Sequence, residues 1–293
     1  MQTITLGATD IQISRLGIGT GTALPSGHCA QSRMSPRDLA NLLIYGHEQG
    51  ITFWDTAVQY GTYPHIRIAL QNINRQKVVI CTKFIATTEQ EIMRLFESSL
   101  QKLSTDHIDI CLLHAIRSEQ ELEKSQGALN ALVSLKKAGH IRAIGLSSHG
   151  LSTLRCVPRF PEIDVVWARL NYAGLIMDTA RQGIFDRLAS IQIFKKYARL
   201  LPKRLLGCIR PWQQGHALTV PDHQNVTEAL QAIHSRGTGI VAMKVFGEGR
   251  LRSDPEKALH YITSLPWVHA CIAGMLSKHE IDQNIQLVNS PPP

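Results

Sequence analysis

The stretch KVVICTKFIATTEQEIMRLFESSLQKLSTDHIDICLLH, residues Lys77–His114, holds two short apolar runs on either side of a longer polar segment. The runs at its ends, Lys77–Phe84 and His107–His114, are rich in Val, Ile, Leu and Cys, which predicts buried strands. Between them, Glu89–Lys102 has the apolar spacing of an amphipathic helix. This order predicts two parallel strands joined by a helix.

The same alternation continues along nearly the whole chain. Further strands are predicted at Ser14–Thr20, Ile51–Thr56, Ile141–Ser148, Ile163–Leu170, Gly239–Val245 and Val268–Gly274. Further helices are predicted after the N-cap Ser35 with Pro36 in the first turn, and at Gln120–Ala138, Val226–Ser235, Pro255–Thr263 and Lys278–Val288. Eight strands in this alternation, most of them apolar on both faces, predict an α/β fold: a (β/α)8 TIM barrel with its helices outside.

A glycine-rich stretch, GIGTGTA at residues 17–23, raises the alternative of an open sheet that binds a dinucleotide. Such a fingerprint opens directly into a helix, whereas the loop LPSGHCAQSR follows here before the helix at Ser35. The preceding TITLGATDIQIS, residues 3–14, has two alternating arms about a turn and predicts an N-terminal β-hairpin that closes the barrel floor. The barrel is therefore favoured.

One connection is about twice the usual length. It carries a basic insertion at 178–222, between the sixth and seventh strands, within one predicted domain spanning residues 1–293. Between Thr179 and Gly215 it holds eight basic residues and one acid, with apolar residues at helical spacing. Two interpretations are open: an outer helix of the barrel, which the sixth crossover requires, or a basic amphipathic helix that contacts an anionic membrane, nucleic acid or an acidic partner. The first is favoured.

Composition and charge narrow the class of protein further. The formal net charge is +8, but most of the excess lies in the insertion, which disfavours a nucleic-acid-coating surface. Six cysteines are scattered without a CxxC pair, so they predict reduced core residues and no metal site. The sequence shows no leader-like segment and no apolar run of transmembrane length. We therefore expect a cytoplasmic protein that contacts no membrane; its oligomeric state is not predictable.

Polar residues lie where three successive strands end. Asp55 and Tyr60 follow the second strand, Lys83 ends the third, and His114 ends the fourth. Active sites of such barrels form at this end of the strands. A lysine in an apolar strand is costly unless it meets an anion, and Asp55 is the neighbouring partner. The charge of Lys83 would lower the pKa of Tyr60, and His114 supplies a second donor to an oxyanion. The set suits protonation of a carbonyl oxygen.

These motifs resemble the aldo-keto reductase family over nearly the whole chain except the insertion. DTAVQYG at residues 55–61 is similar to the family signature, and TKF, LLH and GHIRAIGLSSHG match its later strands. The resemblance implies Tyr60 as proton donor, Asp55 and Lys83 as the pair that tunes it, and His114 as the residue that orients the substrate. It also implies a nicotinamide cofactor, NAD(P)H, because none of these side chains carries a hydride.

The resemblance further implies residues that hold the cofactor. They are Gly19, Thr20, Ser147, Ser148, Asn171, Met243, Gly247, Gly249, Gly274 and Asn284. Ser147-Ser148 replaces the usual Ser-Asn, Trp167 stands where an amide glutamine is usual, and Met243 replaces an aromatic residue. The stretch MKVFGEGRL, residues 243–251, resembles the same stretch in one branch of the superfamily. The resemblance implies that its turn lies along the cofactor phosphates.

The function implied is an NAD(P)-dependent oxidoreductase that interconverts a small carbonyl compound (aldehyde, ketone or sugar) and an alcohol. The alternative is a catalytically weak binding or regulatory protein that senses the cofactor. Gly274 and Glu280 stand where family members that prefer NADPH carry a lysine and an arginine. We therefore expect NADH to bind at least as well as NADPH.

Overall fold

The computed structural model describes residues 1–22, 29–174 and 220–290, and its centre is a closed barrel of parallel strands. The order around the barrel is β10-β3-β4-β5-β6-β7-β8-β9. The strands are β3 (Leu16–Gly19), β4 (Phe53–Asp55), β5 (Val79–Phe84), β6 (Ile110–Ile116), β7 (Ala143–Ser148), β8 (Val165–Arg169), β9 (Gly239–Met243) and β10 (Ala270–Ala273). The predicted (β/α)8 barrel is confirmed.

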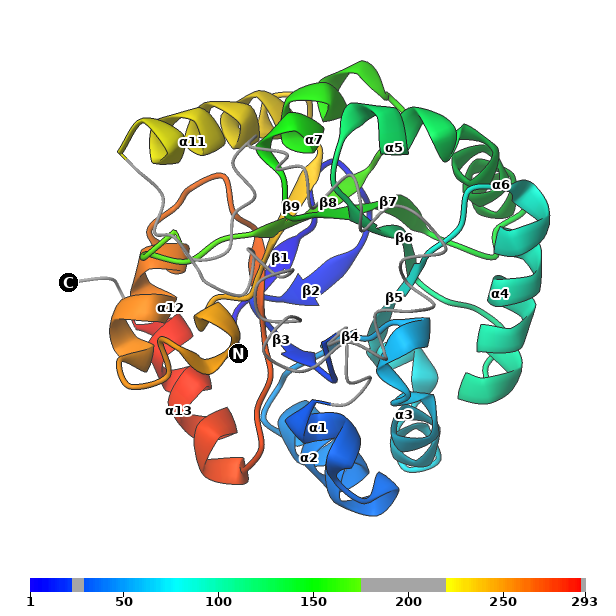
Figure 1. The fold of residues 1–293 in the computed structure, drawn as a ribbon. Coiled ribbons are helices and arrows are strands. Elements are labelled where there is room, and N and C mark those ends of the chain that lie inside the picture. Colours follow the sequence, from blue (N-terminus) through cyan, green and yellow to red (C-terminus); the bar gives the residue numbers. More distant parts are fainter. Residues whose placement is uncertain (23–28, 175–219, 291–293) are drawn as a thin grey trace, which may run out of the picture.

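Helices form a ring around these strands (Figure 1). Their bounds are α1 (Ala30–Arg33), α2 (Pro36–Glu48), α3 (Tyr63–Leu70), α4 (Glu89–Leu103), α5 (Glu119–Lys124), α6 (Gln126–Lys137), α7 (Leu151–Cys156), α11 (Val220–His234), α12 (Pro255–Thr263) and α13 (Lys278–Asn289). The prediction of one helix over Gln120–Ala138 is wrong. That segment forms two helices, since Ser125 between them has a φ of −93° and a ψ of 11°, outside the helical range.

Side-chain caps fix where the helices begin. Ser35 Oγ accepts from the Asp38 N–H at 3.1 Å, as predicted for the start of α2. At α4, Thr88 Oγ1 accepts from the Glu91 N–H, and the Glu91 carboxylate accepts from the Thr88 N–H at 3.1 Å. Such reciprocal caps satisfy two N–H groups that have no partner within the helix. Among the described residues, three helices were not predicted: α1 within the expected loop before Ser35, and the short α3 and α7.

A two-stranded antiparallel hairpin, β1 (Thr3–Thr5) and β2 (Gln12–Ser14), lies across the amino-terminal end of the barrel. Its Leu6, Ile11 and Ile13 are fully buried and pack with the inward side chains of the barrel. In Figure 1 the hairpin is the blue pair seen through the ring of strands. The hairpin expected from the sequence is confirmed, and the open end of the barrel is the opposite one.

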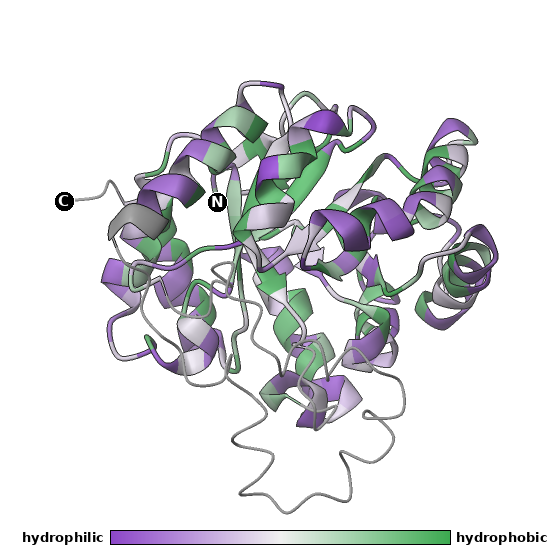
Figure 2. Ribbon diagram, turned by 45° about the horizontal axis from the view of Figure 1, so that its top comes forward, coloured by the Kyte–Doolittle hydropathy of each residue, from purple (hydrophilic) through white to green (hydrophobic). Residues whose placement is uncertain are grey.

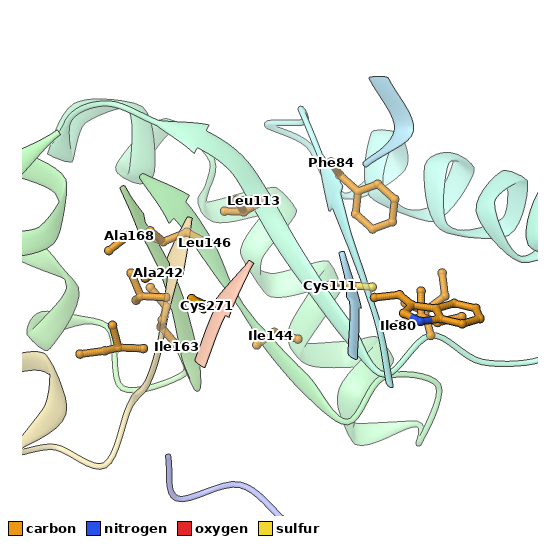
Figure 3. Close-up of a cluster of buried hydrophobic side chains, with 14 of the residues drawn as sticks. Ile80, Phe84, Cys111, Leu113, Ile144, Leu146, Ile163, Ala168, Ala242 and Cys271 are labelled. Carbon is orange, nitrogen blue, oxygen red and sulfur yellow. The ribbon is translucent and has the colours of Figure 1, made fainter. Parts of the chain in front are cut away.

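Two apolar layers hold the barrel together. Inward side chains such as Phe53 and Val165 form the smaller layer, and outward side chains packed against the helices form the larger one. Figure 3 shows part of the outer layer, including Ile80 of β5, Cys111 of β6 and Ile144 of β7. Figure 2 shows the green, hydrophobic strands surrounded by helices with purple, hydrophilic faces. This double burial explains why the strands read as continuous apolar runs.

The predicted basic insertion at 178–222 lies outside the described residues, except that α11 begins at Val220. Its role as an outer helix stays a prediction. Within the described ranges, no helix is long and apolar enough to cross a membrane.

Candidate active site

An ion pair lies at the carboxyl ends of β4 and β5. Lys83 Nζ is 2.6 Å from Asp55 Oδ1 and 2.7 Å from Oδ2, and it also donates to the carbonyl of Thr56 at 2.9 Å. The lysine side chain is 1% exposed and the aspartate side chain 6%. Trp167 of β8 donates its indole N–H to Asp55 Oδ1 at 2.8 Å from the far wall of the barrel. The carboxylate is therefore held by two donors, the ammonium of Lys83 and the indole of Trp167, in a buried site.

Burial alone would lower the pKa of Lys83, but Asp55 and the phenol of Tyr60 raise it, and the net pKa lies above the ordinary value for lysine. The ammonium thus stays charged across the physiological range. A buried ion pair with this geometry and an added hydrogen bond is the arrangement in which mutual attraction offsets the loss of water.

Tyr60 lies at the end of a short 3-10 turn, Val58–Tyr60, directly after β4. The Lys83 ammonium is 5.2 Å from the centroid of its ring, and the His114 ring packs edge-on at 5.8 Å. Burial raises the pKa of Tyr60 to about 12, against the lowering effect of Lys83. The expected lowering of this pKa by Lys83 is present, but loss of water outweighs the nearby cation, so the net pKa lies above the ordinary value.

Backbone of the first loop covers the tyrosine. A Cβ on Gly21 would stand 2.8 Å from Cβ and Cγ of Tyr60, which is closer than real side chains approach. Only glycine fits there without moving the ring. Gly21 lies in the GIGTGTA stretch but was not among the predicted site residues.

His114 lies on β6 where the strand is irregular. The pairing with β7 shifts between Leu113 and Ile116, and Ala115 has a φ of 58°. Such bulges re-aim the neighbouring side chains. His114 Nδ1 is 3.1 Å from Gln59 Oε1. Burial, followed by the charges of Lys83 and Lys244, lowers the pKa of His114 to about 3, so the ring is neutral at pH 7.

A charged cluster that the sequence analysis missed lies one layer above Trp167. Arg169 is the next inward residue of β8, and its side chain is only 4% exposed. Its Nη2 is 2.9 Å from Glu248 Oε1, and Lys244 Nζ is 3.2 Å from the same oxygen. We name Arg169, Lys244 and Glu248 the mouth cluster. The period of two in a strand could have found Arg169, because it shares a face with Trp167.

His149 follows β7 beside this cluster. Burial lowers its pKa well below the ordinary value, and Arg169 and Lys244 add to the effect, so its ring is neutral. Its Nδ1 is buried with no hydrogen-bond partner among the described residues.

Several residues expected to bind the cofactor have hydroxyl groups that are hydrogen-bonded to the protein backbone. Thr20 Oγ1 donates to the Asp55 carbonyl at 3.0 Å. Ser147 Oγ accepts from the Ala115 N–H at 2.8 Å, and Ser148 Oγ donates to the Ile116 carbonyl at 2.9 Å. The two serines therefore brace the bulge that carries His114.

The other expected residues lie around the same end of the barrel. Asn171 follows β8, and Met243 ends β9 with an inward, 8% exposed side chain. Gly247 and Gly249 have φ values of 54° and 90° in the turn after β9, where non-glycine Glu248 also has a φ of 59°. Gly19 ends β3.

The segment after β10 contains a carboxylate, that of Glu280, at the start of α13. Glu280 Oε2 accepts from the Leu276 N–H at 2.7 Å, and Ser277 Oγ accepts from the Glu280 N–H at 3.2 Å, so the start of α13 already holds a carboxylate. Lys278 lies over the ring of Tyr45, 4.6 Å from its centroid. Gly274 faces the Gln31 amide, which is 2.1 Å from where a Cβ would stand, and Asn284 is buried on α13.

Comparison with known proteins identifies one family model and several relatives that match this chain. A model of the Aldo/keto reductase family matches residues 15–197. A soybean (Glycine max) protein named a probable aldo-keto reductase is 27% identical over 169 residues, which are 53% of this chain and 47% of that protein. An NADH-specific methylglyoxal reductase of Escherichia coli is 26% identical over 201 residues, 61% of each chain. The matches thus span about half to three fifths of these relatives.

Among solved structures, an aldo-keto reductase from Pseudomonas aeruginosa of unassigned activity superposes with a TM-score of 0.70 at 20% identity, covering 98% of this chain and 93% of that one. At this identity the likeness supports the fold alone.

We predict that Lys83→Met lowers the free energy of unfolding by about 3–5 kcal/mol, because it leaves the Asp55 carboxylate buried without its counter-charge. Chemical denaturation measures this. Lys77→Met, a change of the same kind at an exposed position before β5, is the control and costs little. An unchanged stability for Lys83→Met would show that the pair is solvated.

A second prediction concerns pH. The pKa of His114 falls from 6.5 to about 3 on folding, so the unfolded chain binds the proton first as the pH drops. The free energy of unfolding therefore decreases from pH 6.5 towards pH 3, and at pH 5 the share of His114 is about 2 kcal/mol. Denaturation curves from pH 8 to 4.5 should be flatter for His114→Gln than for the wild type or for the surface variant His279→Gln. Identical slopes in all three would contradict the depressed pKa.

Proposed function

Because the chain belongs to the Aldo/keto reductase family, we propose that it is an NAD(P)-dependent oxidoreductase that interconverts a small carbonyl compound and an alcohol. The observation that carries the proposal is the buried ammonium of Lys83, held by Asp55 and 5.2 Å from the ring of Tyr60. A fixed cation beside a protonated phenol is suited to proton donation at a developing alkoxide. We expect the protein to act in the cytoplasm, since the five cysteines among the described residues are free and buried.

Tyr60 acts as the general acid. With a pKa of about 12, the phenol keeps its proton at neutral pH and gives it up to an alkoxide, which is the stronger base. Lys83 stabilises the negative charge that grows on the phenol oxygen, and Asp55 keeps Lys83 in place and charged. His114, being neutral, donates a hydrogen bond to the carbonyl oxygen and orients it. The nicotinamide, when bound, supplies the hydride.

The residues present fit a nicotinamide dinucleotide that lacks the 2′-phosphate. The start of α13 holds the Glu280 carboxylate and would repel a phosphate there, while Lys278 is engaged with the Tyr45 ring. We propose that Asn284 and the glycine turn Gly247–Gly249 lie along the adenosine and diphosphate, and that Met243 packs on the nicotinamide through its polarizable sulfur. Gly19, Thr20, Ser147, Ser148, Asn171 and Gly274 complete this proposed site.

One observation favours the alternative function of a catalytically weak, cofactor-sensing protein. The hydroxyl groups of Ser147 and Ser148 are engaged with the β6 backbone, so the nicotinamide amide has fewer free donors there. Turnover distinguishes the two functions.

We predict that Tyr60→Phe abolishes carbonyl reduction and leaves NADH binding nearly intact, because only the transferable proton is lost. Reduction of an aldehyde panel is followed by NADH absorbance, and binding by NADH fluorescence. Tyr63→Phe is the matched control, since Tyr63 is also buried but its hydroxyl bonds Thr82 and Ser99. More than a tenth of wild-type rate in Tyr60→Phe would overturn the general-acid role.

For the cofactor, we predict that NADH binds at least as tightly as NADPH. Titration of both cofactors against one preparation measures this, and a tenfold preference for NADPH would contradict it.

Glu280→Arg removes the repelling carboxylate and adds a donor, so it should raise the affinity for NADPH relative to that for NADH by about tenfold or more. Glu256→Arg makes the same charge change on α12 and should leave the ratio unchanged.

A further inference from the structure

The side-chain amide of Gln59 is in contact with the imidazole ring of His114. Gln59 Oε1 lies 3.1 Å from His114 Nδ1. Gln59 is the middle residue of the 3-10 turn Val58–Tyr60, so the turn that presents the phenol of Tyr60 also presents this amide. The phenol ring and the imidazole pack edge-on with their centroids 5.8 Å apart. The contact therefore joins the turn after β4 to β6 directly beside the proposed general acid.

The two nitrogens of the His114 ring have different surroundings. Nδ1 has Gln59 as its hydrogen-bond partner, whereas Nε2 has no partner among the described residues. The backbone beside the ring is fixed at the bulge, where the Ala115 N–H donates to Ser147 Oγ at 2.8 Å. Nε2 is therefore the ring nitrogen left to meet a substrate, and its task is to donate to a carbonyl oxygen.

A neutral imidazole carries one proton, which lies on either nitrogen. The titratable groups that interact with the ring of His114 come from other elements and are Lys83 of β5, Lys244 after β9, Tyr60 and His149. Burial, followed by the charges of the two lysines, lowers the pKa of His114 to about 3, so the doubly protonated ring does not form at neutral pH. Since the hydrogen bond at one nitrogen decides which of the two is protonated, the partner of Nδ1 decides whether Nε2 donates or accepts.

The amide of Gln59 offers both functions. Its oxygen accepts and its NH2 group donates, and a half-turn about the last side-chain bond exchanges the two at the same 3.1 Å contact. With the oxygen toward Nδ1, the ring proton lies on Nδ1, and Nε2 presents a lone pair that repels a carbonyl oxygen. With the NH2 group toward Nδ1, the proton lies on Nε2 and is available to that oxygen.

We propose that Gln59 is a positioning residue: in the cofactor-bound enzyme its NH2 group donates to His114 Nδ1 and so holds the ring proton on Nε2, toward the substrate carbonyl. The proposal rests on the proposed function, because carbonyl reduction is what requires a donor at Nε2. Gln59 acts through the imidazole ring and not on the reacting atoms. Gln59→Glu leaves only acceptors at this position and therefore selects the opposite tautomer.

The tautomer is measured directly by NMR. In protein labelled with ¹⁵N-histidine and saturated with NADH, long-range ¹H–¹⁵N spectra distinguish a protonated ring nitrogen from an unprotonated one. The signals of His114 are those that disappear in His114→Gln. At pH 8 we expect the proton on Nε2 in the wild type, on Nδ1 in Gln59→Glu, and on both in exchange in Gln59→Leu. A wild-type proton on Nδ1 would overturn the proposal.

Turnover of the aldehyde panel with NADH gives the second readout. Gln59→Glu should lower kcat at pH 8 by about a hundredfold or more, as when an oxyanion donor is lost, and leave the Kd for NADH unchanged. Gln59→Leu should lower kcat only a few-fold, because the unrestrained ring still populates both tautomers. Gln76→Glu makes the same change at an exposed position before β5 and is the matched control, with kcat unchanged.

A loss of kcat in Gln59→Glu no larger than that in Gln59→Leu would also overturn the proposal, since an amide with a merely structural role would not separate the two variants. If the wild type reduces no aldehyde, the proposed function fails, and the NMR spectra still decide the role of Gln59. A proton on Nε2 in the wild type and on Nδ1 in Gln59→Glu supports control of the ring by the amide, and the same tautomer in both contradicts it.

Discussion

The ion pair between Asp55 and Lys83 is the interaction on which the site depends. It joins β4 to β5, and Trp167 ties the same carboxylate to β8 across the barrel. Because both charges are removed from water, neither residue is stable there without the other. The pair places a positive charge beside Tyr60, 5.2 Å from the centroid of its ring.

The barrel was predictable because its strands are apolar on both faces and alternate with amphipathic helices. The four residues Asp55, Tyr60, Lys83 and His114 were predictable as neighbours because parallel strands in a barrel end on one side. Their environment was not predictable in the same way. The pKa of Tyr60 depends on how much water the first loop excludes, and a sequence does not give that volume. Lys83 lowers this pKa as expected, but burial outweighs its effect.

Other features that were not predicted from the sequence have local causes. The break between α5 and α6 is a single residue with a non-helical ψ, Ser125, which hydrophobic spacing does not reveal. The hydroxyl groups of Ser147 and Ser148 serve the bulge in β6, and a bulge is a tertiary feature. Arg169 was overlooked although its position on the inward face of β8 follows from Trp167, so strand parity applied to charged residues would have found it.

The central claim is that Asp55 and Lys83 are coupled in a dry interior. A double-mutant cycle on the free energy of unfolding, with Asp55→Asn, Lys83→Met and the double variant, tests it most directly. We predict that the double variant is more stable than Lys83→Met alone, because removal of the second charge ends the cost of burying it unpaired. If the losses of the two single variants simply add in the double variant, the pair is not coupled and the account is contradicted.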